Sequence, residues 1–217
     1  MGAIERRVRE RNEIREKIMN AARELFAQQG IEAVSMRKVA EAVEYSTAII
    51  YSHFADKQAL LREICLADFA ALAETFVHLA GVADPMDRIR EIGLAYARFG
   101  LDHPNQYRLM FMTPHEPVLS KDDLQAVGKG NPDQDGYAFL RATVQEAIAS
   151  GRLRKELTDA DEVCQILWPA VHGMVSLQII KGCDGWLEWR PFELRMGMLL
   201  DWLAGGMSSA QQMGGGA

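Results

Sequence analysis

One stretch of the sequence, residues 35–54 (SMRKVAEAVEYSTAIIYSHF), limits most strongly what this chain can fold into. Its pattern predicts two short helices, residues 36–43 and 47–53, joined by a tight turn. Ser35 and Ser46 stand where a hydroxyl can accept hydrogen bonds from the first backbone N–H groups of each helix. Ala40 is small where the two helices must cross. The residues expected on the inside of the corner are Val39, Val43, Tyr45, Ile50 and His53.

The outside of the second predicted helix is short, compact and uncharged. It carries Ser46, Thr47, Ala48, Tyr51 and Ser52. Hydroxyl groups can donate or accept hydrogen bonds, and a helix of this size fits the major groove of DNA. The pattern therefore predicts a surface that contacts base edges.

From about residue 15 to residue 61 the chain resembles the N-terminal DNA-binding domain of TetR-family transcriptional repressors. The run of residues 50–60 (IYSHFADKQAL) is similar to the most specific motif of that family. The family usually has glycine in the turn where this chain has Glu44, and a positive φ at a residue with a Cβ costs about 1 kcal/mol. The other matching positions are Ile18, Ala21, Ala22, Leu25, Phe26, Gly30, Ser35, Val39, Ala40 and residues 46–57.

The resemblance implies that the N-terminal domain, which we call the reading head, binds double-stranded operator DNA. We expect Arg37, Tyr51 and Lys57 to hold phosphates together with the start of the first short helix at Ser35. The positions expected to face base edges, with His53 beside them, are Ser46, Thr47, Ala48 and Ser52.

The distribution of charge along the chain agrees with DNA binding by its N-terminal part. The chain of 217 residues has a net charge of −6, but residues 1–60 hold 10 Lys/Arg and 9 Asp/Glu, whereas residues 61–217 hold 14 and 21. DNA binding needs a local basic face and not a basic protein. The acidic excess lies outside the expected reading head.

Helical periodicity without any strand pattern predicts an all-α fold of about nine helices. The expected domains are a flexible basic arm (1–12), a helix-turn-helix domain (13–56), a helical effector-binding and dimerisation domain (57–204) and a disordered tail (205–217). The arm is either an extension that follows DNA or a frayed, solvated continuation of the first helix. The expected helices are residues 13–29, 36–43, 47–53, 57–79, 85–102, 105–112, 136–150, 158–181 and 192–203, with a long loop at 113–133.

Two segments of the second domain, residues 103–111 (HPNQYRLMF) and 167–175 (LWPAVHGMV), resemble a Trp/His-Gly subfamily of TetR C-terminal domains. The resemblance implies that the last two helices pair with the same helices of a second copy, and a symmetric dimer is the commonest assembly. The expected interface residues are Val175, Leu177, Leu199 and Trp202; the alternative is that such residues form only the core of the subunit.

The same resemblance implies a small, apolar effector bound among the middle and later helices. Methionine and aromatic side chains suit an adaptable apolar pocket, although at helical spacing they also form ordinary cores. The candidate lining residues are Tyr96, Phe99, Met110, Phe111, Phe139, Trp168 and His172.

We expect neither catalysis nor a metal or cofactor, because the five histidines are scattered and no nucleophile or phosphate-binding motif is present. Three widely spaced cysteines indicate neither a disulfide framework nor a zinc site. A charged N-terminus and no apolar run of spanning length predict a cytoplasmic protein without a membrane partner. An alternative function is an all-helical dimeric interaction protein that no longer reads DNA.

Overall fold

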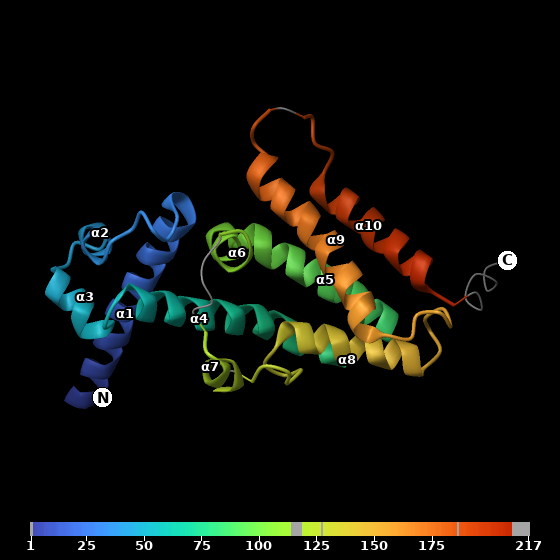
Figure 1. Ribbon diagram of the computed structural model, residues 1–217, viewed down its shortest axis with the longest axis horizontal. Helices are drawn as coiled ribbons and strands as arrows, with labels where there is room; N and C mark the ends of the chain where they lie inside the picture. The colour runs from blue at the N-terminus through green and yellow to red at the C-terminus, as the bar shows by residue number, and fades with distance from the viewer. Residues whose placement is uncertain (1, 114–118, 127, 186, 210–217) are drawn as a thin grey trace. The chain divides into compact units, whose positions relative to one another are not determined.

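A computed structural model describes residues 2–113, 119–126, 128–185 and 187–209 (Figure 1). This part of the chain forms ten α-helices and one 3-10 helix and contains no strand, which confirms the predicted all-α class. The helices are α1 (Ala3–Gln29), α2 (Met36–Ala42), α3 (Thr47–His53), α4 (Lys57–Val77), η1 (His78–Gly81), α5 (Pro85–Asp102), α6 (Pro104–Phe111), α7 (Lys121–Ala126), α8 (Gly136–Ala149), α9 (Ala160–Lys181) and α10 (Phe192–Met207).

The chain divides into two compact units. Unit 1 consists of Met1–Phe69 and Asn105–Leu124, and unit 2 consists of Ala70–Pro104 and Gln125–Ala217. Helix α4 contributes to both, and α6 belongs with α1 to α3. These units therefore do not follow the domain division predicted after residue 56.

Unit 1 encloses an apolar core supplied by α1 to α4 together with one residue of α6. Ile18, Phe26, Ile50 and Leu60 are completely buried there, and Leu109 is 1% exposed. Burial of each such side chain is worth about 1.5–3 kcal/mol, so packing rather than helix propensity holds the short helices α2 and α3 in place.

A buried ion pair also ties unit 1 together. The Asp68 side chain on α4 is 1% exposed and accepts hydrogen bonds from Arg23 Nε on α1, at 3.0 and 2.9 Å, and from Gln106 Nε2 on α6, at 2.9 Å. Both carboxylate oxygens therefore have partners, as a buried charge requires.

Unit 2 is built around the packing of α5, α8 and α9, with α10 lying against α5 and α9. Gly93 on α5 allows the close approach of α10, because a Cβ there would lie 2.6 Å from Leu200 Cδ2. An isolated bridge between Leu153 and Ser208 holds the end of α10 against the segment between α8 and α9.

Three predicted boundaries are wrong. Helix α1 begins at Ala3 instead of residue 13, so the expected flexible arm is helical from that residue onward. Residues Lys121–Ala126 form α7 inside the predicted loop, where Ser120 and Asp123 cap each other's backbone N–H groups at 2.9 and 3.1 Å. Helix α10 continues to Met207 into the predicted tail; of that tail, residues 210–217 lie outside the described residues, as do 114–118 of the loop.

The prediction that no segment is long and apolar enough to cross a bilayer is also wrong. Lys57–Gly81 and Ala160–Lys181 both meet that criterion, each containing an 18-residue window with a mean hydropathy of 1.4. Length and composition alone do not separate a spanning helix from a helix packed inside a protein. In α4 the apolar positions are occupied by core residues such as Leu60 and Ile64, both completely buried.

Candidate nucleic-acid interface and ligand site

The corner between α2 and α3 has the predicted local geometry. Ser35 Oγ accepts a hydrogen bond from the Lys38 N–H at 3.2 Å, and Ser46 Oγ accepts one from the Ile49 N–H at 3.4 Å, which confirms both predicted caps. Val39, Val43 and Ile50 are at most 2% exposed. The inside of the corner is therefore closed, and the outer face of α3 is fixed relative to α2.

Glu44 lies in the turn with a φ of 59°. A Cβ is disfavoured in this left-handed region, and glycine is the residue that adopts it without steric cost. The turn therefore carries backbone strain at Glu44.

The outer face of α3 presents small polar and aromatic groups. Ala48, Tyr51 and Ser52 are exposed, and Thr47 is half-buried. The Ser52 hydroxyl donates to the Ile49 carbonyl oxygen at 2.7 Å, so this hydroxyl is left with its acceptor capacity. The face carries no ionised side chain and can meet base edges only through hydroxyl groups and apolar contacts.

Two of the residues expected to hold phosphates, Arg37 and Lys57, already have protein partners. Arg37 Nε lies 2.9 Å from a carboxylate oxygen of Glu41, which raises the pKa of the exposed guanidinium. Lys57 Nζ donates to the Ile31 carbonyl oxygen at 3.0 Å, so it also ties α4 to the loop after α1. An ammonium has three donors, and a phosphate contact by Lys57 would use another of them.

His53 ends α3 at a junction with α1. Its carbonyl oxygen accepts a hydrogen bond from Arg15 Nη1 at 2.9 Å, and its Nδ1 is buried without a partner among the described residues. Burial and then the nearby charges of Arg11 and Arg15 lower the pKa of the His53 imidazole. Both effects favour the neutral form of the ring.

Three of the seven predicted effector residues meet in unit 2. Trp168 Nε1 donates to the Tyr96 hydroxyl at 3.0 Å, and that hydroxyl lies 3.2 Å from His172 Nδ1. The ring of Tyr137, which is not among the residues predicted for this site, lies 6.1 Å from that of Trp168. Burial lowers the pKa of His172. We call Tyr96, Tyr137, Trp168 and His172 the aromatic cluster.

The other four predicted effector residues have other described neighbours or belong to the other unit. Phe139 is stacked on Phe76 with ring centroids 6.3 Å apart, and Phe99 lies 5.2 Å from the ring of His103. Met110 and Phe111 are on α6 and belong to unit 1. Phe99 and Phe139 belong to unit 2, as the aromatic cluster does, and the ring contacts described for them are with His103 and Phe76.

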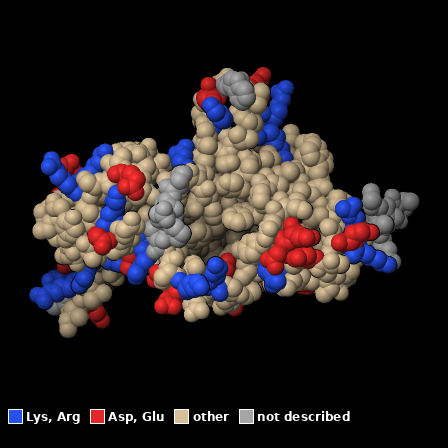
Figure 2. Space-filling model, viewed as in Figure 1, with Lys and Arg blue, Asp and Glu red and all other residues tan. Residues whose placement is uncertain are grey.

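Apolar side chains are exposed along α9 and α10. On the face seen in Figure 2, most of the surface over these helices carries neither Lys or Arg nor Asp or Glu. Of the predicted interface residues, Leu177 is 52% and Trp202 is 69% exposed, and Leu199 is half-buried. Val175 is completely buried in its own subunit, so its side chain cannot reach a second copy. Further exposed apolar residues on these helices, outside the predicted interface set, are Ile166, Ile180, Leu194 and Met198.

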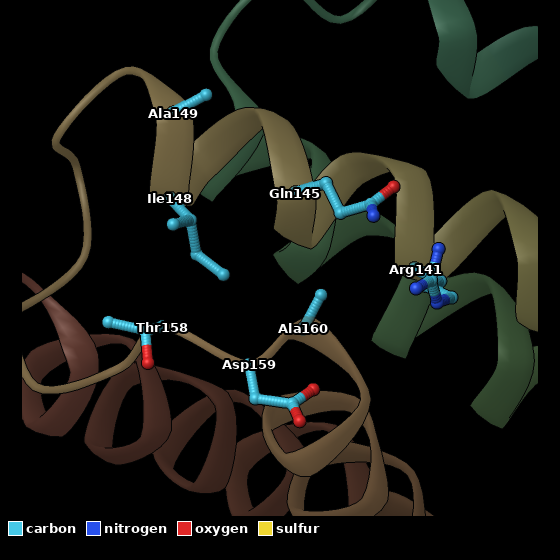
Figure 3. Close-up of a pocket in the computed structure, with 7 residues that line it drawn as sticks. All are labelled: Arg141, Gln145, Ile148, Ala149, Thr158, Asp159 and Ala160. Atoms are coloured by element: carbon cyan, nitrogen blue, oxygen red, sulfur yellow. The ribbon is translucent and has the colours of Figure 1, made fainter.

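An open cleft of about 490 Å³ lies where α8 faces the start of α9 (Figure 3). Its two charged lining residues have partners within the protein, since Asp159 caps α9 by accepting from the Asp161 N–H at 2.8 Å, and Arg141 pairs with Asp161 at 2.9 Å. None of the seven predicted effector residues lines it. Its lining residues are Arg141, Gln145, Ile148, Ala149, Thr158, Asp159 and Ala160.

Two family models match the chain along most of its length. Residues 18–64 match the model described as bacterial regulatory proteins of the tetR family, and residues 89–194 match the one described as a tetracyclin repressor-like C-terminal domain. The chain belongs to the TetR family. The first match contains α2 and α3, and the second contains the aromatic cluster.

Two curated relatives are similar to this TetR-family chain over its N-terminal part. The HTH-type transcriptional regulator UidR of Escherichia coli is 39% identical over 54 residues, which are 25% of this chain and 28% of UidR. The HTH-type transcriptional repressor AcnR of Corynebacterium efficiens is 38% identical over 61 residues, 28% of this chain and 32% of AcnR. The chain thus matches about a third or less of the length of these relatives.

The fold is shared over nearly the whole chain. A crystal structure of a TetR family transcription regulator from Marinobacter aquaeolei superposes with a TM-score of 0.72, covering 93% of this chain and 99% of the other at 16% identity. At 16% identity, this similarity establishes only that the two proteins share a fold.

Proposed function

We propose that this protein is a transcriptional regulator that binds a roughly palindromic operator as a homodimer and represses by occupying a promoter. The observation that carries the proposal is the outer face of α3. It is exposed and uncharged, and it is held by two serine caps above a buried Ile50. In a helix-turn-helix dimer, two such helices enter successive major grooves about 34 Å apart.

We assign base contacts to Ser46, Thr47, Ala48 and Ser52. The Ala48 methyl and the methyl of Thr47 are suited to thymine methyl groups, and the hydroxyls are suited to donor and acceptor positions on base edges. The absence of an arginine or lysine on this face of α3 disfavours bidentate contacts to guanine.

We assign backbone contacts to Arg37, Tyr51 and Lys57, with Ser35 and His53 at the edges of the contact. Tyr51 is 52% exposed and is the largest group on the face, and the side chain of Arg37 is 81% exposed. Phosphate contacts fix the register of a protein on DNA without reading its sequence. Arg37 would exchange the carboxylate of Glu41 for a phosphate oxygen.

A homodimer through α9 and α10 would cover the exposed Leu177, Leu194, Met198 and Trp202. Exposed apolar surface of this kind marks protein interaction sites, and a two-fold axis brings each helix of one subunit against its equivalent or its neighbour in the other. This assembly would form a four-helix interface.

We place the effector at the aromatic cluster. The Tyr96 hydroxyl and His172 are hydrogen-bonded to each other among large apolar rings, which is the composition of a small-molecule site. An effector bound there need change the operator affinity by only about 1–3 kcal/mol to alter promoter occupancy. A Trp168→Ala variant that kept its full response to an effector would exclude Trp168 from the site.

Selection of duplexes from a random-sequence pool by the purified protein tests the DNA-reading function. We expect enrichment of a palindrome whose half-sites lie about one helical turn apart. A Tyr51→Phe variant should then bind the selected and the scrambled duplex more weakly by the same factor, because a phosphate contact does not depend on sequence. If no sequence is enriched, the protein is instead an all-helical dimeric interaction protein that does not read DNA.

A further inference from the structure

We propose that the N-terminal half of α1 is a second DNA-contacting surface, in which Arg7 and Arg11 bind phosphates that flank the bases read by α3. This inference rests on the proposed DNA-reading function. It adds a contact outside the helix-turn-helix, and it depends on residues 3–14 being helical.

Helix formation places Arg7 and Arg11 on one side of α1 and all the acidic residues of this segment on the opposite side. Residues of a helix advance by 100° each, so side chains three, four and seven positions apart share one side. Arg7 and Arg11 therefore lie on the same side as Ile4 and Val8, and that side continues to Arg15. The opposite side carries all three acidic residues of the segment with the remaining arginines, namely Glu5, Arg6, Arg9, Glu10 and Glu13.

The opposite side is internally neutralised. Arg6 pairs with Glu10 and Arg9 pairs with Glu13, each at 3.7 Å. Among the residues that the structure describes, Arg7 and Arg11 have no carboxylate within ion-pair distance, and both are exposed. An unfolded arm would present nearly balanced charges, whereas the helix presents one basic side.

Arg15 shows which way the basic side faces. Its Nη1 donates to the His53 carbonyl oxygen at 2.9 Å, and its guanidinium lies 4.4 Å from the centroid of the Phe54 ring. The side of α1 that carries Arg7 and Arg11 is therefore the side that contacts the C-terminal end of α3. Figure 1 shows α1 continuing past that end of α3, and Figure 2 shows Lys and Arg side chains gathered there.

The spacing extends the reading surface by two turns. With a rise of about 1.5 Å per residue, Arg11 lies about 6 Å and Arg7 about 12 Å beyond Arg15 along the axis of α1. The charge of Arg11 also contributes to the lowered pKa of His53, which places this guanidinium near the end of α3.

DNA phosphate is the occupant that fits this position. An acidic membrane surface would also attract two arginines beside the exposed Ile4 and Val8, which are 79% and 55% exposed. The basic side adjoins the C-terminal end of α3, however, so a duplex held by the outer face of α3 would bring phosphates close to Arg7 and Arg11.

The test compares two double variants of equal charge. Arg7→Gln/Arg11→Gln removes the basic side, and Arg6→Gln/Arg9→Gln removes the same charge from the opposite side. Binding to a duplex selected by the wild-type protein, and to its scrambled counterpart, is measured by fluorescence anisotropy at several salt concentrations. We expect the first variant to lose on the order of tenfold in affinity for both duplexes, and the slope of log K against log salt to fall by about 0.9 for each phosphate contact removed. The control should retain nearly wild-type affinity.

Equal behaviour of the two variants would overturn the inference while leaving the proposed function intact. Failure of the wild-type protein to select any duplex would overturn both. A second measurement does not depend on the stability of the variants. A photoreactive phenylalanine analogue at Val8 should cross-link to the selected duplex, whereas the same analogue at Glu13 should not, and cross-linking from Glu13 alone would contradict the assignment.

Discussion

At the scale of single residues, conformation and burial set apart a few positions that sequence pattern alone does not rank. Glu44 is the only described residue other than glycine with a positive φ, and Asp68 is among the few buried polar residues. For each of these two residues we predict how a substitution changes the free energy of unfolding.

Glu44 should be replaced more favourably by glycine than by alanine. Both substitutions remove the carboxylate, but only glycine removes the Cβ that makes a φ of 59° unfavourable. We expect Glu44→Gly to be more stable than Glu44→Ala by about 1 kcal/mol, measured by urea unfolding. Equal stabilities would show that the turn stores no strain at this residue.

Asp68→Asn should destabilise unit 1 severely. It leaves the guanidinium of Arg23, only 12% exposed, without its counter-charge, and breaking a buried pair costs about 3 kcal/mol or more. Asp161→Asn is the matched control, because Asp161 binds Arg141 through both oxygens in the same way but is 40% exposed. We expect that change to destabilise the protein much less, because water screens an exposed pair. Similar losses in the two variants, measured by urea unfolding, would contradict this view of the Arg23–Asp68 pair.

Stability should fall between neutral and mildly acidic pH because of His172. Burial holds the pKa of His172 below its ordinary value of 6.5, to which it returns in the unfolded chain. In the window between these pKa values the unfolded chain binds more protons, so stability that is complete above pH 6.5 is lost as the pH falls through the window. The pKa of His53 is also lowered, so His53 likewise contributes to the loss of stability as the pH falls.

Thermal unfolding at pH 7.5 and pH 5 measures this loss. The Tm of the wild-type protein should fall more than that of a His172→Gln variant. An identical fall in the two proteins would mean that His172 titrates normally in the folded state.

At the scale of helices, the elements predicted well are those that combine an apolar stripe with a cap. Residues 36–43 and 47–53 were placed within one residue of α2 and α3, because Ser35, Ser46 and the inward-facing Val39 and Ile50 mark them unambiguously. The predicted start at residue 85 is also correct, because proline at the first helical position lacks an N–H that would have no partner there; the structure adds a cap, since the Asp84 side chain accepts from the Met86 N–H at 2.8 Å.

The elements that were missed are held by local polar contacts instead of burial. The first turns of α1 have no apolar stripe facing a core; the Glu5 carboxylate accepts from the Gly2 N–H at 2.8 Å, and ion pairs such as Arg6–Glu10 follow. Helix α7 has no buried residue. Periodicity detects apolar faces, so it gives no signal for either segment.

The candidate sites could be predicted only in part, because contacts between distant residues leave no local pattern. Asp68 lies 45 residues from Arg23 and 38 from Gln106. Tyr96, Trp168 and His172 were predicted to lie together, but Tyr137 was not. The burial of Val175 also required the packing of α9 to be known.

At the scale of the whole molecule, exposed apolar surface on α9 and α10 predicts assembly. A Leu194→Glu/Trp202→Glu variant puts four charges into the proposed two-fold interface, two from each subunit, at positions that are 58% and 69% exposed in the single chain. Sedimentation should show a dimer for the wild-type protein and a monomer for the variant. Because both positions are exposed, the monomer should keep its helical circular dichroism. A variant that still forms dimers would show that the dimer interface lies on another surface.

The proposed occupancy of an operator requires both the outer face of α3 and a second copy of the chain. The most direct measurement is fluorescence anisotropy of the purified protein with the DNA just upstream of its own coding region and with a scrambled duplex, at several salt concentrations. We predict tight binding to the upstream duplex alone, with an affinity that falls steeply as salt rises. Equally weak binding to both duplexes, persisting for sequences selected from a random pool, would contradict the account.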